Sequence, residues 1–254
     1  MNRYSVYLLL LPFLLSAFVV KAQSFELTDK TGKFISDKIM ILDTDSNVIE
    51  LNKLLNKVTV LSLVYFDCDQ NCPKLMEGIY ELIRNTREMK DLDYQVLTIG
   101  FRPDHHLNKA RSVEDHYKEM LKKDNLEQEK WQFFITDTLN TRLLTQNIGY
   151  KYYHDNDRYM HTSLLTVVSP GGKIINYMYG TRFLALDFEM TWQNAIHEIP
   201  RITVPRNIKY CANYRAPAHE HLHKMAIIFG LSILLCSVTL FLWLVFKRKS
   251  RNEI

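Results

Sequence analysis

The fold of this chain is inferred outward from one segment, Leu61-Ser-Leu-Val-Tyr-Phe-Asp-Cys68-Asp-Gln-Asn-Cys72-Pro-Lys-Leu-Met76. Residues 58–66 are almost unbroken apolar, which is typical of a strand buried on both faces of a sheet. Pro73 follows the second cysteine, and proline is favoured in the first turn of a helix. Apolar residues then recur at helical spacing up to Ile83. The two thiols are therefore predicted where a central strand turns into a helix N-terminus, an edge of α/β sheets where ligands gather.

Cys68 and Cys72 are spaced i, i+4, which on a helix places two side chains on one face about 6 Å apart. Two such sulfurs could share a metal ion, close a disulfide or act as a redox pair. The redox motif of thioredoxins is C-x-x-C, and the extra residue here favours metal ligation over ordinary thiol exchange. A helix N-terminus favours thiolate, whereas Asp67 and Asp69 oppose it. A bound cation would deprotonate the thiols outright.

The rest of the pattern predicts alternating strands and helices. Expected strands are Tyr94–Phe101, Trp131–Ile135 and a hairpin of Ser163–Val168 with Lys173–Tyr179, preceded by one or two strands before a helical turn at Leu51–Leu55. Expected helices run from Pro73 to near Asp91, over Leu107–Lys123, from a cap at Asp137 or Thr138 to a stop at Gly149, and over Phe183–Glu198. A polar loop is expected over Lys151–Tyr159. This order predicts an α/β fold: a thioredoxin-like mixed sheet with flanking helices, followed by one transmembrane helix.

Both ends of the chain carry targeting signals. The predicted organisation is a signal peptide over 1–22, a thioredoxin-like domain over 23–205, a juxtamembrane linker over 206–224, a transmembrane helix over 225–246 and a cytoplasmic basic tail over 247–254. Both signals place the main domain on the extracytoplasmic side of a membrane. The chain has only four cysteines, so it is no disulfide-stapled scaffold. Its net charge of +4 is mild and no basic aromatic face stands out, which argues against nucleic acid as a partner.

His161 is the candidate third ligand, because in a thioredoxin-like sheet the segment before the hairpin lies beside the cysteine loop. Two thiolates select Cu(I), and imidazole also suits copper. Three ligands would leave an open position for handing the metal over, whereas structural zinc sites normally use four. Asp69 is interpreted as a helix-start acid rather than a ligand, and Met76 and Met160 as packing residues. Three other histidines, at 219, 221 and 223, suit a polar linker as well as a transient metal site, and the role of Cys211 stays open.

These residues resemble the Sco/SenC family of copper proteins. The resemblance is carried by Val64-Tyr-Phe-Asp-Cys68-Asp-Gln-Asn-Cys72-Pro73, by His161-Thr-Ser before an apolar strand, and by Pro170-Gly-Gly-Lys173. Tyr179-Gly180 with Phe183 and Asp187 is similar to the bacterial branch of that family. The chain departs from the family pattern at Asp69, where proline is frequent, and at Met160, where an acidic residue is common.

The resemblance implies a thioredoxin-like, membrane-tethered protein of the bacterial inner membrane, with its main domain in the periplasm. It implies copper bound by Cys68, Cys72 and His161, and a copper-accepting subunit of a terminal oxidase as partner. The predicted task is help in assembling the copper site of cytochrome c oxidase, which is not enzymatic turnover. The alternative is an enzyme: a thiol–disulfide oxidoreductase in which Cys68 and Cys72 reduce the cysteines of the oxidase copper site.

Overall fold

A computed structural model of the protein describes residues 27–35, 38–68, 71–89, 92–101, 107–155, 158–201 and 210–212, with short pieces between 229 and 239. The predicted signal peptide and basic tail, and most of the predicted linker and span, lie outside these residues. Within the predicted span, residues 229–230, 232–234, 236–237 and 239 are helical. No helix in the described part of the chain has both the length and the apolar character needed to cross a bilayer. The membrane topology stays a prediction.

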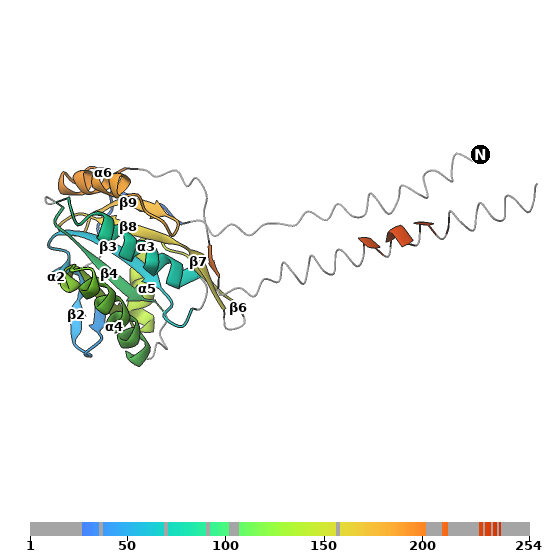
Figure 1. The fold of residues 1–254 in the computed structure, drawn as a ribbon, viewed down its shortest axis with the longest axis horizontal. Coiled ribbons are helices and arrows are strands. Elements are labelled where there is room, and N and C mark those ends of the chain that lie inside the picture. The colour runs from blue at the N-terminus through green and yellow to red at the C-terminus, as the bar shows by residue number, and fades with distance from the viewer. Residues whose placement is uncertain are drawn as a thin grey trace, which may run out of the picture. The chain divides into compact units, whose positions relative to one another are not determined.

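The central sheet is built from β1 (Met40–Asp43), β2 (Val48–Glu50), β3 (Val58–Val64), β4 (Tyr94–Gly100), β5 (Trp131–Ile135), β8 (Leu164–Val168) and β9 (Ile174–Tyr179). These seven strands lie in the order β2-β1-β5-β4-β3-β8-β9 (Figure 1). Strands β3, β4 and β5 run parallel to one another, and the remaining pairs are antiparallel. The sheet is therefore mixed, as predicted, and the predicted strand bounds agree with the structure to within two residues.

The helices of this domain are α2 (Leu51–Leu54), α3 (Asn71–Asn85), α4 (Leu107–Lys123), α5 (Thr138–Asn147) and α6 (Ala185–Ile196), with a 3-10 turn η1 (Gln128–Lys130). Helices α3 and α4 contact each other, and α6 packs against β3, β8 and β9 (Figure 1). The bounds of α4 are those predicted. Helix α3 begins two residues before Pro73 and ends at Asn85, so its predicted extension to near Asp91 was wrong.

Strand β3 lies inside the sheet, and every one of its residues is buried. Its carboxyl end is aligned with that of β4, because Val64 is paired with Gly100. Strand β8 runs antiparallel to β3, with Ser62 opposite Leu165. The residues just before β8 therefore lie beyond the carboxyl end of β3, beside the segment that leads to the cysteines.

The predicted polar loop over residues 151–159 was wrong. The chain instead forms β6 (Tyr152–Asp155) and β7 (Arg158–Thr162), which pair antiparallel with Tyr152 opposite His161. Strand β7 is also flanked by β10 (Tyr210–Ala212), in a three-stranded sheet of order β10-β7-β6. The tyrosines of this segment favour strand structure, and their contribution outweighs the polarity that suggested a loop.

Candidate metal centre

Cys72 lies in the first turn of α3, immediately before Pro73, as the sequence predicted. It has 0% of its surface exposed, although it sits at the end of a helix. Unpaired backbone N–H groups and the helix dipole favour a thiolate at such a position. Burial in the core opposes the thiolate unless a cation or a hydrogen-bond donor compensates for the lost hydration. The position therefore suits a sulfur that binds a metal ion.

His161 lies in β7 and has only 1% of its surface exposed. The register of β8 against β3 brings it to the carboxyl edge of the parallel strands, although 89 residues separate it from Cys72 in the sequence. The expectation that it precedes the β8–β9 hairpin is confirmed. It belongs to a strand rather than to a loop, so its ring is held by the backbone pairing of β7.

The structure brings the sulfur of Cys72 and the Nε2 atom of His161 to 3.8 Å from each other. Metal bonds of about 2.3 Å to sulfur and about 2.0 Å to nitrogen would place two donor atoms about 3.5 to 3.7 Å apart, at angles between tetrahedral and trigonal. The observed separation is close to that range. A thiolate and an imidazole that converge in this way fit a soft first-row metal ion without rearrangement of either element.

Cys68 lies four residues before Cys72, in the non-helical segment that joins β3 to α3. It is 8% exposed, and its backbone N–H donates to the carbonyl oxygen of Tyr65 at 3.0 Å. The structure forms no disulfide between Cys68 and Cys72. Within the described ranges, no three His, Cys, Asp or Glu side chains are grouped closely enough to hold a metal ion. Two of the three predicted ligands are therefore brought together, and the role of Cys68 stays a prediction.

The other side chains considered as ligands are Asp69, Met76 and Met160. Asp69 lies outside the described residues. Met76 follows Cys72 by one turn of α3 and is buried in the apolar core, in agreement with a packing role. Met160 belongs to β7, one residue before His161, and stays interpreted as a packing residue.

An aromatic wall surrounds His161. The ring of Phe101 meets the imidazole edge-on, with ring centroids 5.2 Å apart. The centroid of the Tyr150 ring lies 5.6 Å from that of the imidazole. Phe101 also contacts Tyr152, at 5.3 Å between centroids. These rings exclude water from one side of the imidazole. Sequence reasoning did not assign Tyr150 to the site, because only the β6–β7 pairing shows how residues after Gly149 return to His161.

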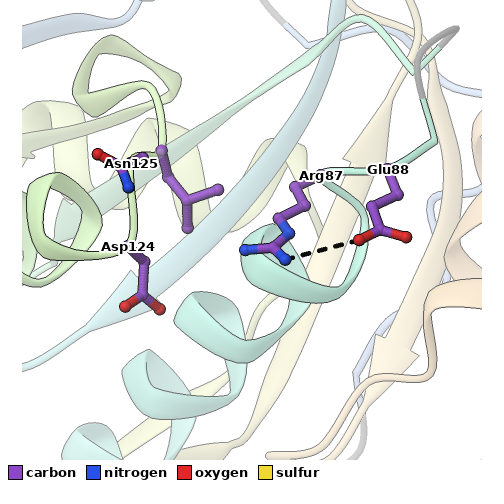
Figure 2. Close-up of a pocket in the computed structure, with 5 residues that line it drawn as sticks. Arg87, Glu88, Asp124 and Asn125 are labelled. Carbon is purple, nitrogen blue, oxygen red and sulfur yellow. Dashed lines mark ion pairs between the residues drawn. The ribbon is translucent and has the colours of Figure 1, made fainter.

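A separate hollow lies near the other end of α3. Figure 2 shows Arg87 and Glu88 on one side of it and Asp124 and Asn125 on the other; Leu126 also lines it. Arg87 and Glu88 form an exposed ion pair of 3.5 Å. The hydroxyl of Tyr80 donates to the carboxylate of Asp124 at 2.6 Å, which raises the pKa of Tyr80. This hollow offers solvated charges rather than soft metal ligands.

The hollow and the Cys72–His161 pair are well separated. Helix α3 has 15 residues, which corresponds to about 22 Å of length. Cys72 lies in its first turn, whereas Arg87 follows its last residue. The open concavity and the buried thiol–imidazole pair are therefore distinct features at opposite ends of one helix.

Solved structures share the fold that holds this pair. A putative electron transfer protein from Aquifex aeolicus VF5 is 21% identical, with a TM-score of 0.56 over 66% of this chain and 95% of its own. Copper-bound ScoI from Arabidopsis thaliana is 14% identical, with a TM-score of 0.51 over 65% of this chain and 98% of its own. BsSco is described as a member of the Sco family of cytochrome c oxidase assembly proteins and as having a disulfide switch. It is 14% identical, with a TM-score of 0.50 over 67% of this chain and 97% of its own.

At these identities the likeness shows a shared fold. The mixed sheet with flanking helices fits the predicted thioredoxin-like architecture. A scan against protein-family models and a search of curated proteins found no match.

Proposed function

We propose that this chain binds one copper ion through Cys68, Cys72 and His161, and that it helps to assemble the copper site of a terminal oxidase. The observation that carries the proposal is the 3.8 Å separation between the Cys72 sulfur and the His161 Nε2 atom. The copper-bound Arabidopsis ScoI shares the fold, and BsSco belongs by its description to a family of oxidase assembly proteins. The residue pattern of the cysteine segment and of His161 supports the same assignment.

The chemistry of the donor atoms supports copper over a hard cation. Thiolates select Cu(I), imidazole also binds copper, and carboxylate-preferring ions such as Mg²⁺ or Ca²⁺ would find too few oxygen ligands here. Cys72 and His161 are held by α3 and by the β6–β7 pairing. They would therefore form the fixed part of the site, and Cys68 would be supplied by the preceding segment.

Release of the ion would proceed by ligand exchange. A three-ligand site leaves a coordination position that a thiolate of the acceptor can occupy before any bond to the donor breaks. Cys68, outside a regular element, is the ligand that would leave with the least disturbance of the fold. Cys72 and His161 would follow, so the ion would remain coordinated throughout the transfer.

The proposed location is the periplasmic face of a bacterial inner membrane. The apolar stretch 225–246 followed by the basic tail 247–254 is the sequence signal for a single C-terminal span, and residues 1–22 are the signal for export. A tether of this kind would raise the effective concentration of the domain at a membrane-embedded oxidase.

A second candidate function is reduction of the oxidase cysteines by the Cys68–Cys72 pair. The reduced Cys68–Cys72 pair would supply the two electrons for this reaction and would itself end as a disulfide. The disulfide switch described for BsSco, which shares the fold, favours keeping this candidate. It differs from copper delivery in needing the two sulfurs but no metal ion.

Copper titration and transfer test the proposal directly. The full chain is purified in detergent with reduced cysteines, and Cu(I) is titrated against a competing chelator. One tightly bound copper per chain is expected, together with its movement to the metal-free, reduced copper domain of a terminal oxidase. His161→Ala should lose most of the affinity, whereas His197→Ala, at an exposed position after α6, should not. A reduced wild-type chain that binds no copper would overturn the proposal.

The oxidised copper domain of the oxidase separates the two candidates. A thiol reductase would reduce that domain without copper, and His161→Ala would largely retain the reaction because both thiols remain. A copper carrier would leave the oxidised domain unchanged and would transfer copper only to its reduced form.

A further inference from the structure

The Nδ1 atom of His161 faces two oxygen atoms, on the side of the ring opposite Cys72. It is hydrogen-bonded to the hydroxyl group of Tyr150 and lies 3.3 Å from the carbonyl oxygen of Thr162. The Tyr150 hydroxyl in turn donates to the same Thr162 carbonyl, at 3.1 Å. Three polar groups thus form a closed triangle within the protein interior.

This triangle is satisfied by one tautomer of a neutral imidazole. The Thr162 carbonyl oxygen is only an acceptor, and both the Tyr150 hydroxyl and the Nδ1 atom of His161 face it. A proton on Nδ1 makes both of its contacts favourable, because it then faces the phenolic oxygen and the carbonyl oxygen. A lone pair on Nδ1 would instead be directed at the carbonyl oxygen. The geometry therefore places the proton on Nδ1 and leaves the lone pair of Nε2 directed at the Cys72 side, where a metal ion would be bound.

The chain holds the Tyr150 hydroxyl firmly in place. Tyr150 is 5% exposed, its backbone N–H donates to Thr145 at 2.8 Å, and its ring lies 6.0 Å from that of Phe101. Gly149, just before it, adopts a φ of 69° and accepts a backbone hydrogen bond from Thr28 at 2.9 Å. These hydrogen bonds hold the backbone of Gly149 and Tyr150, which follow α5. They therefore fix the position from which the Tyr150 side chain extends to the imidazole of His161.

We propose that Tyr150 is a positioning residue for the metal ligand His161, and this proposal rests on the proposed copper site. Tyr150 does not contact the ion. It fixes the tautomer and the ring orientation of His161, so that Nε2 is available as a ligand without a prior proton shift. Partners that orient a ligand in this way typically change metal affinity by about 10- to 100-fold when they are removed.

Tyr150→Phe removes the hydroxyl group and keeps the ring. Tyr177→Phe is the matched control, because its buried hydroxyl also donates to a backbone carbonyl, that of Ile148 at 2.9 Å. The control hydroxyl is not among the partners of His161. The Tyr177 hydroxyl also accepts the backbone N–H of Lys30, at 3.2 Å, just as the Tyr150 hydroxyl has two partners, in His161 and Thr162. Each variant therefore loses two hydrogen bonds, so any general cost to the fold should be similar.

The first readout needs no metal. In the reduced, copper-free full chain in detergent, ¹⁵N NMR of the His161 ring reports which nitrogen carries the proton. The expected result is a protonated Nδ1 in the wild type and in Tyr177→Phe, and a smaller fraction with the proton on Nδ1 in Tyr150→Phe, where only the Thr162 carbonyl still faces that nitrogen. A wild-type ring with a bare Nδ1, or an unchanged ring in Tyr150→Phe, would overturn the proposal whether or not copper binds.

The second readout is Cu(I) affinity measured by chelator competition. Tyr150→Phe should bind copper about 10- to 100-fold more weakly than the wild type, and Tyr177→Phe should match the wild type. Equal affinities in all three chains would overturn the positioning role. Failure of the wild type to bind copper would overturn the proposed function instead, and the NMR result would still decide the tautomer.

Discussion

The two ends of helix α3 offer opposite kinds of chemistry. At its N-terminal end, Cys72 is fully buried, and its sulfur lies 3.8 Å from the Nε2 atom of His161, whose ring is packed against aromatic rings. At its C-terminal end, Arg87 and Glu88 border an open hollow that faces Asp124 (Figure 2). The hollow is the more obvious concavity, but its exposed ion pair is the kind that contributes little to stability or recognition. If the proposed copper site is correct, donor chemistry and the carboxyl edge of the parallel strands locate it better than the shape of the surface does.

The largest effect is expected from an alanine substitution at the N-terminal end of α3, with Asp124→Ala in the hollow at the other end as its control. Cys72→Ala removes a proposed metal ligand and should lower Cu(I) affinity by more than about 100-fold, the upper range for loss of a residue that only supports a ligand. Asp124→Ala should leave the affinity unchanged. Chelator competition measures both, and equal losses in the two variants would remove the distinction between the ends.

The next largest effect is expected in the backbone that presents Tyr150. Gly149→Ala would drive a Cβ atom into the carbonyl oxygen of Thr28, at a positive φ. The left-handed conformation and the overlap together should lower the free energy of unfolding by about 2 to 5 kcal/mol. The full chain in detergent, followed by urea denaturation, provides the measurement.

Gly171→Ala is the matched control for this substitution. Gly171 also has a positive φ, but a Cβ atom at this position would have nothing within 4 Å. Its cost should be only about 1 to 2 kcal/mol, from backbone strain alone. Similar costs at the two glycines would show that the close approach to Thr28 does not hold the His161 side of the site.

A smaller effect is expected at the start of α5, the helix that leads to Tyr150. The carboxylate of Asp137 accepts the backbone N–H of Asn140 at 2.8 Å, and hydrogen bonds from Asn140 lower the pKa of Asp137. Asp137→Ala should lower the free energy of unfolding by about 1 kcal/mol. Asp137→Asn keeps an acceptor oxygen and should lose less.

The pH dependence of this cap has a definite sign. The folded pKa of Asp137 is lower than the unfolded value of about 3.9, so the ionised cap contributes fully above that value. Its contribution is lost as the pH falls through the folded pKa. Denaturation between pH 2 and 6 should therefore show a steeper loss of stability in the wild type than in Asp137→Asn. Identical pH profiles would mean that the carboxylate does not stabilise the helix.

The smallest effect is expected in the hollow beside the C-terminal end of α3, at Asp124, which directly follows α4. Asp124→Asn removes the carboxylate that accepts the Tyr80 hydroxyl, so the pKa of Tyr80 should fall toward its ordinary value of about 10. Ultraviolet titration of tyrosinate measures this shift, with Tyr80→Phe to identify the band. Copper affinity should stay unchanged in Asp124→Asn. A change in affinity would connect the two ends of the helix and contradict their independence.

Much of the fold was predictable from the sequence, because local patterns agree with the tertiary structure. The unbroken apolar run indicated β3, the periodic apolar residues indicated α4, and Asp137 and Gly149 indicated the limits of α5. The Cys72–His161 encounter was also predictable, since the hairpin that follows His161 must pair beside β3. The cysteine spacing and the expected position of His161 indicated the residues, the resemblance to a known family supported them, and the strand register supplied the reason for their meeting.

The β6–β7 pairing and the role of Tyr150 were not predicted. The segment from Lys151 to Tyr159 is polar, and polarity was given more weight than its tyrosines, although Asn156-Asp157 are residue types that suit a two-residue hairpin connection. The contact between Tyr150 and His161 depends on how that pairing folds the chain back. No local pattern encodes such a contact, because Tyr150 lies in the connection between α5 and β6 and meets His161 of β7 only through the β6–β7 pairing.

X-ray absorption spectroscopy at the copper edge tests the central claim most directly, because it counts the sulfur and nitrogen atoms bound to the ion. The Cu(I)-loaded full chain is expected to show two sulfur ligands and one imidazole nitrogen, and His161→Ala should lose the imidazole signal. A copper ion bound by sulfur alone in the wild type would contradict a site shared by Cys68, Cys72 and His161.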